Sequence, residues 1–383
     1  MYRILFLSSA GYGRGGASIA LLNLVSYLRE KVEVYVAFPT KGSLYSEFER
    51  IGVHCYCIGE FSLSIYPTSF NLLYFVKTFV GNLIKNRRAQ QKLEELVDII
   101  RPDIIHTNVG PLRIGYNVAC KKNIPHVWHV REYIDKDFKF HPYPTFRYHV
   151  DKYKSKNNYN IVITEGVKSH FALGDNSYVI YDGVFPNHIR PRVADKENYF
   201  LFAGRIQQAK GVLELLSAYI LYVKRGGTIN LKLAGSLENH YFNRCSKIIH
   251  ENNLCDKIEY LGLRDDIYEL MSHAKALVVP SRSEGFGFIT AEAMYNFCPV
   301  VGRDTSGTKE QFDLGKTQTG SEIGLRFINN EELVTRMFEI EKGVDDKMIN
   351  NAHEVVMKNY TIEKCGEKIF KVYKMILSKN RII

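Results

Sequence analysis

Residues 278–300 read VVPSRSEGFGFITAEAMYNFCPV. The apolar run that leads into it, Ala276–Val279, predicts a short buried strand. A tight loop follows at Gly285–Gly287, and a run of good helix formers from Phe288 to Met294 predicts a helix. The order of strand, tight loop and helix indicates an α/β protein.

Two carboxylates belong to this unit, Glu284 on the predicted loop and Glu292 on the predicted helix. Backbone N–H groups at a glycine-rich helix start bind anions, because glycine lets the backbone approach a phosphate closely. Carboxylates beside a phosphate would repel it, so we expect them to accept hydrogen bonds from the hydroxyls of a sugar or a ribose. The pattern therefore favours a nucleotide-sugar site. The alternative is a solvated loop charge and the polar face of a helix.

The stretch resembles the E-x7-E segment of the retaining nucleotide-sugar glycosyltransferases of family 4, which is close to E-G-F-G-x-x-x-x-E-A-M-x-x-G-x-P-V. The matching residues are Glu284, Gly285, Phe286, Gly287, Glu292, Ala293, Met294, Pro299 and Val300. Phe297 stands where the family has glycine. The resemblance implies an α/β fold of the GT-B type, with two Rossmann-like domains whose parallel sheets face each other across a cleft. It also implies that Glu284, Gly285, Phe286, Gly287 and Glu292 bind the donor.

The chain length of 383 residues suggests two domains. We predict an N-terminal acceptor-binding domain over residues 1–185, a linker over 186–196 and a C-terminal nucleotide-sugar domain over 197–360. The resemblance implies that the last helix, within 361–383, packs back on the first domain.

A strand predicted over Tyr199–Ala203 is followed by Arg205 and Lys210 in the pattern G-R-x-x-x-x-K-G. In the family, this Arg and Lys hold the donor diphosphate. Two cations there would stabilise the negative charge that develops as the glycosidic bond breaks, so we expect no metal and no cofactor. The alternative is a pair of surface cations. By the same resemblance, Arg264 lies in a loop near the base and is a candidate for contacting it.

The first half opens with a predicted strand, Arg3–Ser8, and the pattern G-x-G-x-x-G over Gly11–Gly16. This pattern is the dinucleotide fingerprint, but the next predicted strand, Val32–Phe38, lacks the acidic residue at its end that an NAD site requires. By resemblance, Gly15 and Gly16 belong instead to the loop that faces the donor phosphates. The alternative is a loop that merely needs a positive φ.

Residues 124–133 read IPHVWHVREY. The family has a histidine after this strand that contacts the donor sugar, and Arg131 stands at its position. His129 lies two residues earlier, on the same side of a strand. Either His129 or Arg131 is predicted to take the sugar-contacting role. The nearby acidic pair Asp135 and Asp137 is interpreted as part of a solvated loop rather than as a metal site.

Composition limits the partners and the compartment. The seven cysteines are scattered without a Cys-x-x-Cys pair, which indicates neither a zinc site nor a disulfide framework and fits a reducing compartment. The apolar core at the start, MYRILFLSSAGYG, is too short for a signal peptide and no apolar run is long enough to span a bilayer, so we expect neither a signal peptide nor a membrane span. The formal net charge is +10, of which +8 falls in residues 1–190, so an anionic membrane or polyanion is the expected partner. No nucleic-acid-binding motif accompanies this charge.

Residues 70–88 predict a helix with an apolar face made by Leu72, Val76, Phe79 and Leu83. The helix is expected to end in a basic cluster of Lys85, Arg87 and Arg88. One interpretation is a helix that lies on an anionic membrane surface, and the other is a core helix whose basic residues favour its C-terminus.

Together, these features predict a metal-independent retaining hexosyltransferase that moves a sugar from a UDP- or GDP-sugar to an acceptor hydroxyl. The acceptor is expected to be a glycan or a lipid-linked glycan in surface polysaccharide assembly. The expected location is the cytoplasm, with peripheral attachment to the inner face of the membrane. The alternatives are a nucleotide-sugar epimerase of the same fold and a non-catalytic protein that binds a nucleotide or a sugar.

Overall fold

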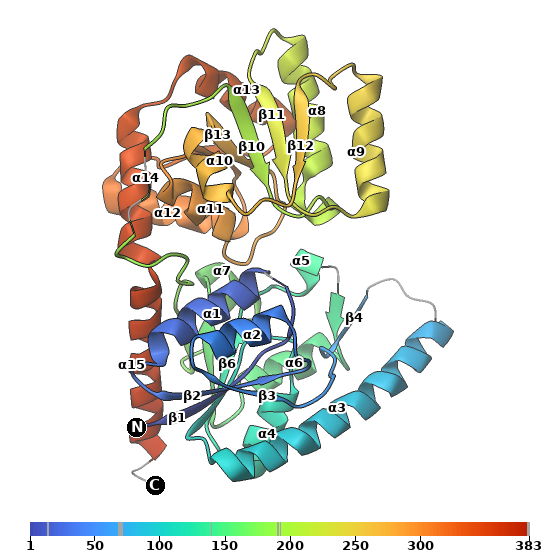
Figure 1. Cartoon of the computed structure of the whole chain (residues 1–383), viewed down its shortest axis with the longest axis vertical. Coiled ribbons are helices and arrows are strands. Elements are labelled where there is room, and N and C mark those ends of the chain that lie inside the picture. Colours follow the sequence, from blue (N-terminus) through green and yellow to red (C-terminus); the bar gives the residue numbers. More distant parts are fainter. Residues whose placement is uncertain (14, 68–71, 139, 190, 192, 381–383) are drawn as a thin grey trace. The chain divides into compact units, whose positions relative to one another are not determined.

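The computed structural model describes residues 1–383 except 14, 68–71, 139, 190, 192 and 381–383, and it leaves out the side chains of 72–75, 137, 138 and 380. The described chain forms two compact units (Figure 1). The first comprises Met1–Pro186 together with helix α15 (Ile362–Asn380), and the second comprises Asn187–Thr361.

The first unit is built on a parallel sheet that contains, in its described part, seven strands in the order β3-β2-β1-β5-β6-β8-β9. Its elements before α15 are β1 (Arg3–Leu7), α1 (Gly16–Leu28), β2 (Glu33–Phe38), α2 (Ser43–Arg50), β3 (His54–Cys57), β4 (Ile65–Pro67), α3 (Leu72–Ile100), β5 (Ile104–Thr107), α4 (Ile114–Lys122), β6 (His126–Val130), α5 (Asp135–Phe138), β7 (Phe140–Pro142), α6 (Phe146–Tyr153), β8 (Asn158–Val162), α7 (Glu165–His170) and β9 (Ser177–Val179). Strands β4 and β7 form a separate antiparallel pair.

Both faces of this sheet are buried, as β1 illustrates. Ile4 and Phe6 point into a core shared with α1, α2 and α15. Leu5 and Leu7 point into a second core shared with α3 and α4. Successive side chains of a strand alternate between faces, so a run without polar residues fits a strand that is covered on both sides.

The second unit repeats this plan with six described strands in the order β12-β11-β10-β13-β14-β15. Its elements are β10 (Tyr199–Ala203), the 3-10 turn η1 (Gln208–Lys210), α8 (Val212–Lys224), β11 (Asn230–Ala234), α9 (Asn239–Glu251), β12 (Ile258–Gly262), α10 (Ile267–His273), β13 (Ala276–Val279), α11 (Phe288–Tyr295), β14 (Val300–Arg303), α12 (Ser306–Thr319), β15 (Leu325–Phe327), α13 (Asn330–Lys342) and α14 (Asp346–Asn359). Helices α8, α9 and α13 pack together over one core, and α11 and α12 both contact α14.

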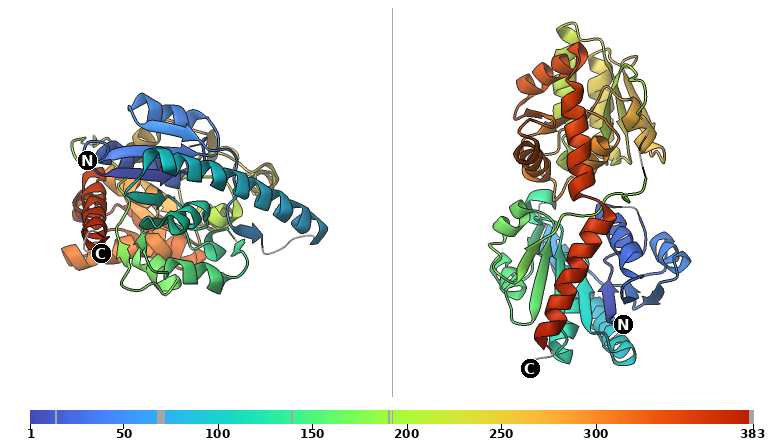
Figure 2. Two further views of the ribbon diagram at one scale, coloured as in Figure 1. Left: turned by 90° about the horizontal axis from the view of Figure 1, so that it is seen from below. Right: turned by 90° about the vertical axis from the view of Figure 1, so that its left-hand side faces the viewer.

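Helix α15 returns to the first unit and lies along it (Figure 2). It contacts α1, and Ile369, Val372, Tyr373 and Ile376 are buried in the core that α1 and α2 share. These four residues are spaced as one face of a helix, which is why they share one core.

Helix α3 corrects one prediction. Leu72–Ile100 form one continuous helix, so the basic cluster at Lys85, Arg87 and Arg88 lies in mid-helix and caps nothing. The reason is that the chain beyond the cluster keeps a helical apolar pattern, with Ala89, Leu93, Leu96, Val97 and Ile100 all buried. Residues 70 and 71 and the side chain of Leu72, which belong to the predicted amphipathic stretch, lie outside the described residues. Among the described helices, none is both long and apolar enough to cross a bilayer.

The segment around Asp135 also differs from the predicted loop. Residues Asp135–Phe138 form the short helix α5. The Asp135 carboxylate lies 2.9 Å from the ring of His170, so it is tied to α7 instead of being free in solvent. The side chain of Asp137 lies outside the described residues.

Candidate active site

The charged residues predicted in the second half meet at one edge of the second sheet. Strands β10 and β13 are neighbours, although two strands and three helices separate them in sequence. The chain order along the sheet reverses between them, and ligands of open α/β sheets bind outside the carboxyl ends of the strands at such a point. Arg205 follows β10, and Glu284 follows β13.

The loops after β10 and β13 are in direct contact. Gly211 adopts a φ of +72°, and a Cβ at this position would lie 2.4 Å from the carbonyl oxygen of Pro280. Only glycine fits there, which explains the glycine of the Lys-Gly pair. The close approach places Lys210 beside Glu284, and the Lys210 Nζ to Glu284 Oε1 distance is 2.7 Å.

This ion pair is partly shielded from water, with 29% of the Lys210 side chain and 15% of the Glu284 side chain exposed. It brings together one residue predicted to hold a diphosphate and one predicted to hold sugar hydroxyls, 74 positions apart in sequence. A cation and an acceptor side by side suit a ligand that carries both a phosphate and a hydroxyl.

Packing and hydrogen bonds within the second unit fix the loop between Glu284 and α11. Gly287 is the N-cap of α11 and has a left-handed backbone, with φ +86°. The Phe286 side chain is buried against Phe288 and Tyr360, so it anchors the loop, and only its backbone is left to face a ligand. The amide of Gln311 donates to the carbonyl oxygens of Phe286 and Gly287, at 2.7 and 3.0 Å.

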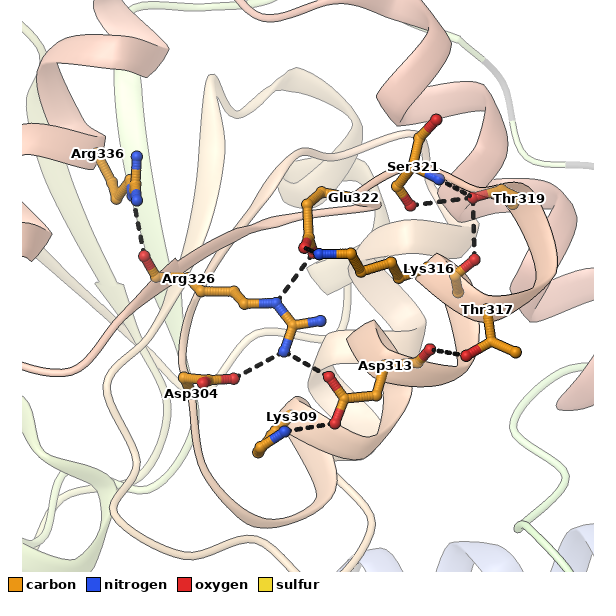
Figure 3. A network of polar contacts seen from close by, with 11 residues as sticks. Asp304, Lys309, Asp313, Lys316, Thr317, Thr319, Ser321, Glu322, Arg326 and Arg336 are labelled. Carbon is orange, nitrogen blue, oxygen red and sulfur yellow. Dashed lines mark hydrogen bonds and ion pairs between the residues drawn. The ribbon is translucent and has the colours of Figure 1, made fainter.

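Helix α12 supplies that support and is itself fixed by an ionic network (Figure 3). At its start, the Gly307 N–H donates to the Glu284 carbonyl oxygen at 2.9 Å. Farther along, the Arg326 guanidinium of β15 lies 2.7 Å from Asp313 of α12, 2.8 Å from Asp304 and 3.0 Å from Glu322. The position of the Glu284 backbone therefore depends on α12 and on the ion pairs that fix this helix.

Glu292 lies in the second turn of α11 and is partly buried. The hydroxyl of Tyr268, on α10, donates to Glu292 Oε1 at 3.3 Å. Burial raises the pKa of the Glu292 carboxyl to about 7, against the opposing effect of this hydrogen bond. Near neutral pH, this carboxyl is thus poised between its acid and its carboxylate forms.

The two remaining predicted residues of this unit are exposed. Arg205 has no hydrogen bond or ion pair within the described residues. Arg264 is half-exposed and pairs with Asp266 through two guanidinium nitrogens, one of them at 2.8 Å. Both follow strands of the same sheet, at its carboxyl edge.

In the first unit, Gly16 is the first residue of α1 and Gly15 is its N-cap, and both are exposed. Gly13 has a φ of +87°, in agreement with the alternative that this loop needs a left-handed residue. Arg14, inside the predicted fingerprint, lies outside the described residues.

His129 and Arg131 lie in a buried polar cluster of the first unit. The Arg131 guanidinium pairs with Asp182, donates to the Asn108 carbonyl at 3.2 Å and lies 3.1 Å from His129 Nδ1. His129 is fully buried, and burial together with the charge of Arg131 lowers its pKa well below the usual value. The predicted contact of either side chain with a donor sugar stays a prediction.

Sequence reasoning missed Tyr268 and Gln311. Tyr268 reaches Glu292 from a position 24 residues earlier, and Gln311 reaches Phe286 from 25 residues later. Neither position belongs to a motif, so only the packing of α10 and α12 against α11 reveals them.

Comparison with solved structures identifies the fold as GT-B. The chain aligns with the Anabaena protein HepE in complex with UDP at a TM-score of 0.78 and 18% identity, over 97% of this chain and 100% of that chain. It also aligns with the lipopolysaccharide outer core galactosyltransferase WaaB at a TM-score of 0.65 and 16% identity, over 94% of this chain and 98% of that one.

Residues 186–355, which span most of the second unit, match the family model described as glycosyl transferases group 1. Two curated relatives of the chain are also glycosyltransferases. An uncharacterized glycosyltransferase of Methanocaldococcus jannaschii is 30% identical over 236 residues, which is 58% of this chain and 61% of that protein. The capsular polysaccharide biosynthesis glycosyltransferase CapM of Staphylococcus aureus is 23% identical over 195 residues, 47% of this chain and 46% of that protein. The matched regions thus span less than two thirds of the length of these relatives.

Proposed function

We propose that this protein is a glycosyltransferase that moves a sugar from a nucleoside diphosphate to an acceptor hydroxyl. The observation that carries the proposal is the Lys210–Glu284 pair at the reversal point of the second sheet. Exposed Arg205 follows the neighbouring strand, and Glu292 lies on the helix after Glu284. A nucleotide sugar needs both kinds of group, because its diphosphate takes cations and its hydroxyls take carboxylates.

In the proposed reaction, the bond between sugar C1 and the diphosphate oxygen breaks, and a bond between C1 and the acceptor oxygen forms on the same face. The acceptor proton goes to the departing diphosphate oxygen. Arg205 and Lys210 stabilise the charge that develops there, so that no metal ion is needed. Lys210 pairs with Glu284, and the arriving diphosphate would share this cation.

We further propose a UDP- or GDP-hexose as donor and a role in surface polysaccharide assembly. The relative CapM is a capsular polysaccharide biosynthesis glycosyltransferase, which supports that setting, and the HepE structure with UDP supports a nucleoside diphosphate. Gly285, Gly287 and Arg264 of the second unit are proposed to contact the donor. The acceptor is proposed to bind the first unit. Gly15 and Gly16 of this unit keep their predicted role toward the donor phosphates, and His129 or Arg131 keeps the predicted contact with the donor sugar.

Attachment to an anionic membrane is proposed through α3. Its side chains at Val76, Val80, Leu83 and Ile84 are about half exposed, which is unusual for aliphatic residues of a helix packed on a core. Lys77, Lys85, Arg87 and Arg88 lie among them. A flotation assay with vesicles that contain or lack anionic lipid tests this. Binding that does not depend on the lipid charge, or no binding, contradicts the attachment.

Thermal unfolding in the presence of UDP, GDP, ADP or NAD at equal concentration tests the donor site. A ligand at a hundred times its dissociation constant stabilises by about 2.7 kcal/mol, which gives a measurable rise in Tm. We expect UDP or GDP to raise the Tm and Arg205→Ala to remove the rise. A rise with NAD alone would instead support the glycine fingerprint at Gly11–Gly16 and contradict the proposal.

A product assay separates transfer from its alternatives. A hexose sugar nucleotide with the base that raises the Tm is incubated with the protein and with candidate acceptors, and the anomeric configuration of the product is read by NMR. Retention is the expected outcome. A new sugar nucleotide formed without acceptor would indicate an epimerase, and binding without any product would indicate a non-catalytic protein.

A further inference from the structure

The first unit contains a cavity of about 790 Å³ between α3, α4 and the β4–β7 pair. Figure 1 shows α3 running past α4 toward β4. The cavity lies wholly within this unit, and none of the residues assigned above to the donor lines it. Its volume is in the range of small-molecule sites.

One wall of the cavity carries a buried cation, Arg113, at the N-cap of α4. Only 8% of Arg113 is exposed. Its guanidinium lies 3.3–3.4 Å from His149 Nδ1 and stacks near the ring of Tyr148, and within the described chain it has no carboxylate partner. Arginine keeps its charge in proteins, and a buried charge without a counter-ion is costly.

The neighbours of Arg113 do not supply the missing negative charge. Burial and the charge of Arg113 lower the pKa of His149 to about 3, so His149 is neutral at physiological pH. Glu94 also lines the cavity, but it pairs with Lys121 at 2.6 Å. The electrostatics therefore favour an anion that enters from the cavity and contacts Arg113.

One part of the cavity lining is suited to hydrocarbon. Leu63, Ile65 and Phe79 line it, together with Leu83 of α3. Leu83 also belongs to the half-exposed aliphatic row on α3, so the apolar lining continues onto the surface of the helix. A chain longer than the cavity would have apolar surface to follow.

Amide side chains hold the walls in place. Asn86 of α3 pairs with both backbone groups of Ser62, accepting at 2.7 Å and donating at 3.2 Å. Asn117 of α4 donates to Gln90 of α3 at 3.3 Å. The cavity is therefore preformed, which lowers the entropic cost of binding.

We propose that this cavity binds the phosphate-bearing end of a lipid, with the phosphate on Arg113 and the hydrocarbon along Leu83 and Phe79. As an acceptor site, it deepens the proposed transferase function and rests on it. The binding itself needs only the first unit. It is therefore tested without any nucleotide, so that a failure here and a failure of transfer are distinguishable.

The experiment titrates the full chain with decyl phosphate below its critical micelle concentration, by calorimetry. Inorganic phosphate and decyl maltoside are titrated in parallel as the anion and the apolar chain alone. We expect decyl phosphate to bind at least about tenfold more tightly than either, because it uses both parts of the cavity. Equal binding of decyl phosphate and inorganic phosphate, or of decyl phosphate and decyl maltoside, overturns the proposal.

Variants locate the site. Arg113→Met should weaken decyl phosphate by at least about tenfold, since it removes a charge-assisted hydrogen bond. Leu83→Glu changes a half-exposed residue, so we expect the variant to fold. It places a negative charge in the cavity that repels the phosphate, and it should weaken decyl phosphate binding as strongly as Arg113→Met does. The control is Lys92→Met, which removes an exposed cation from the same helix outside the cavity lining and should leave the affinity within about twofold.

The single tryptophan reports whether each variant is folded. Trp128 is fully buried, and its ring centroid lies 5.8 Å from that of His149, which contacts Arg113. A variant with the parent's tryptophan emission has kept this packing. If Leu83→Glu keeps the emission and binds decyl phosphate like the parent, the cavity is not the site.

Discussion

The affinity of this protein for a nucleoside diphosphate should depend on pH through Glu292. Its carboxyl is predicted to accept hydrogen bonds from ligand hydroxyls, and only the carboxylate form accepts with both oxygens. Burial raises its pKa to about 7. Protonation should therefore compete with ligand binding within the physiological range.

The magnitude follows from the fraction ionised. With a pKa of about 7, roughly one carboxyl in eleven is ionised at pH 6 and roughly ten in eleven are ionised at pH 8. If only the ionised form binds, the apparent dissociation constant scales with the inverse of this fraction. The affinity should then be about tenfold lower at pH 6 than at pH 8.

Calorimetric titration with UDP or GDP at pH 6, 7 and 8, at constant ionic strength, measures this ratio. Glu292→Gln is the matched control, because its profile contains the titration of the ligand phosphate but not that of residue 292. Tyr268→Phe removes the hydrogen bond that lowers the Glu292 pKa, so the midpoint should move to higher pH. Identical pH profiles for the parent and Glu292→Gln would refute the reasoning.

The remaining predictions concern the loops around Glu284. Lys210→Met should weaken the nucleoside diphosphate at least about tenfold in the same titration, whereas the nearby Arg282→Met should change it little. Gly211→Ala should lower the free energy of unfolding by clearly more than Gly320→Ala, measured in urea, because both glycines have a φ of +72° but only Gly211 also faces a backbone oxygen. An equal loss would mean that the contact with that oxygen relaxes freely. Arg326→Met should cost about 1–3 kcal/mol, since it leaves three carboxylates without their shared cation. An unchanged urea midpoint would show that solvent already screens this network.

Local pattern was enough to predict the elements that carry the site. The predicted strands Tyr199–Ala203 and Ala276–Val279 coincide with β10 and β13, because each is a short apolar run that ends in residues unfit to continue it. The helix from Phe288 to Met294 is confirmed within one residue. The proximity of Lys210 to Glu284 followed only from the resemblance, since 74 positions separate them.

Properties that depend on packing between distant elements were not predictable. The pKa of Glu292 depends on Tyr268 and on burial, neither of which a sequence pattern records. The uncompensated charge of Arg113 is visible only once His149 and Glu94 are placed. Helix α3 was predicted too short because a basic cluster resembles a helix end, whereas the buried apolar pattern beyond it continues the helix.

The six described strands of the second sheet follow the same order as the first six in the strand order of the first sheet. The side chains at the two reversal points nevertheless differ. In the first unit, the corresponding point lies between β1 and β5. Asn108 occupies it, donating to the Ala17 carbonyl at 2.9 Å and accepting from Arg131, whose charge Asp182 neutralises. In the second unit, Arg205 is exposed, and the side chains of Lys210 and Glu284 have only each other as hydrogen-bond partners among the described residues. Polar groups whose hydrogen bonds are already made inside the protein gain little free energy from contact with a ligand. The groups at the reversal point of the second unit are therefore better suited to bind one. The first unit also contains Arg113, at the start of the helix that follows β5, and among the described residues this cation has no carboxylate partner, which is why we propose an anionic acceptor there.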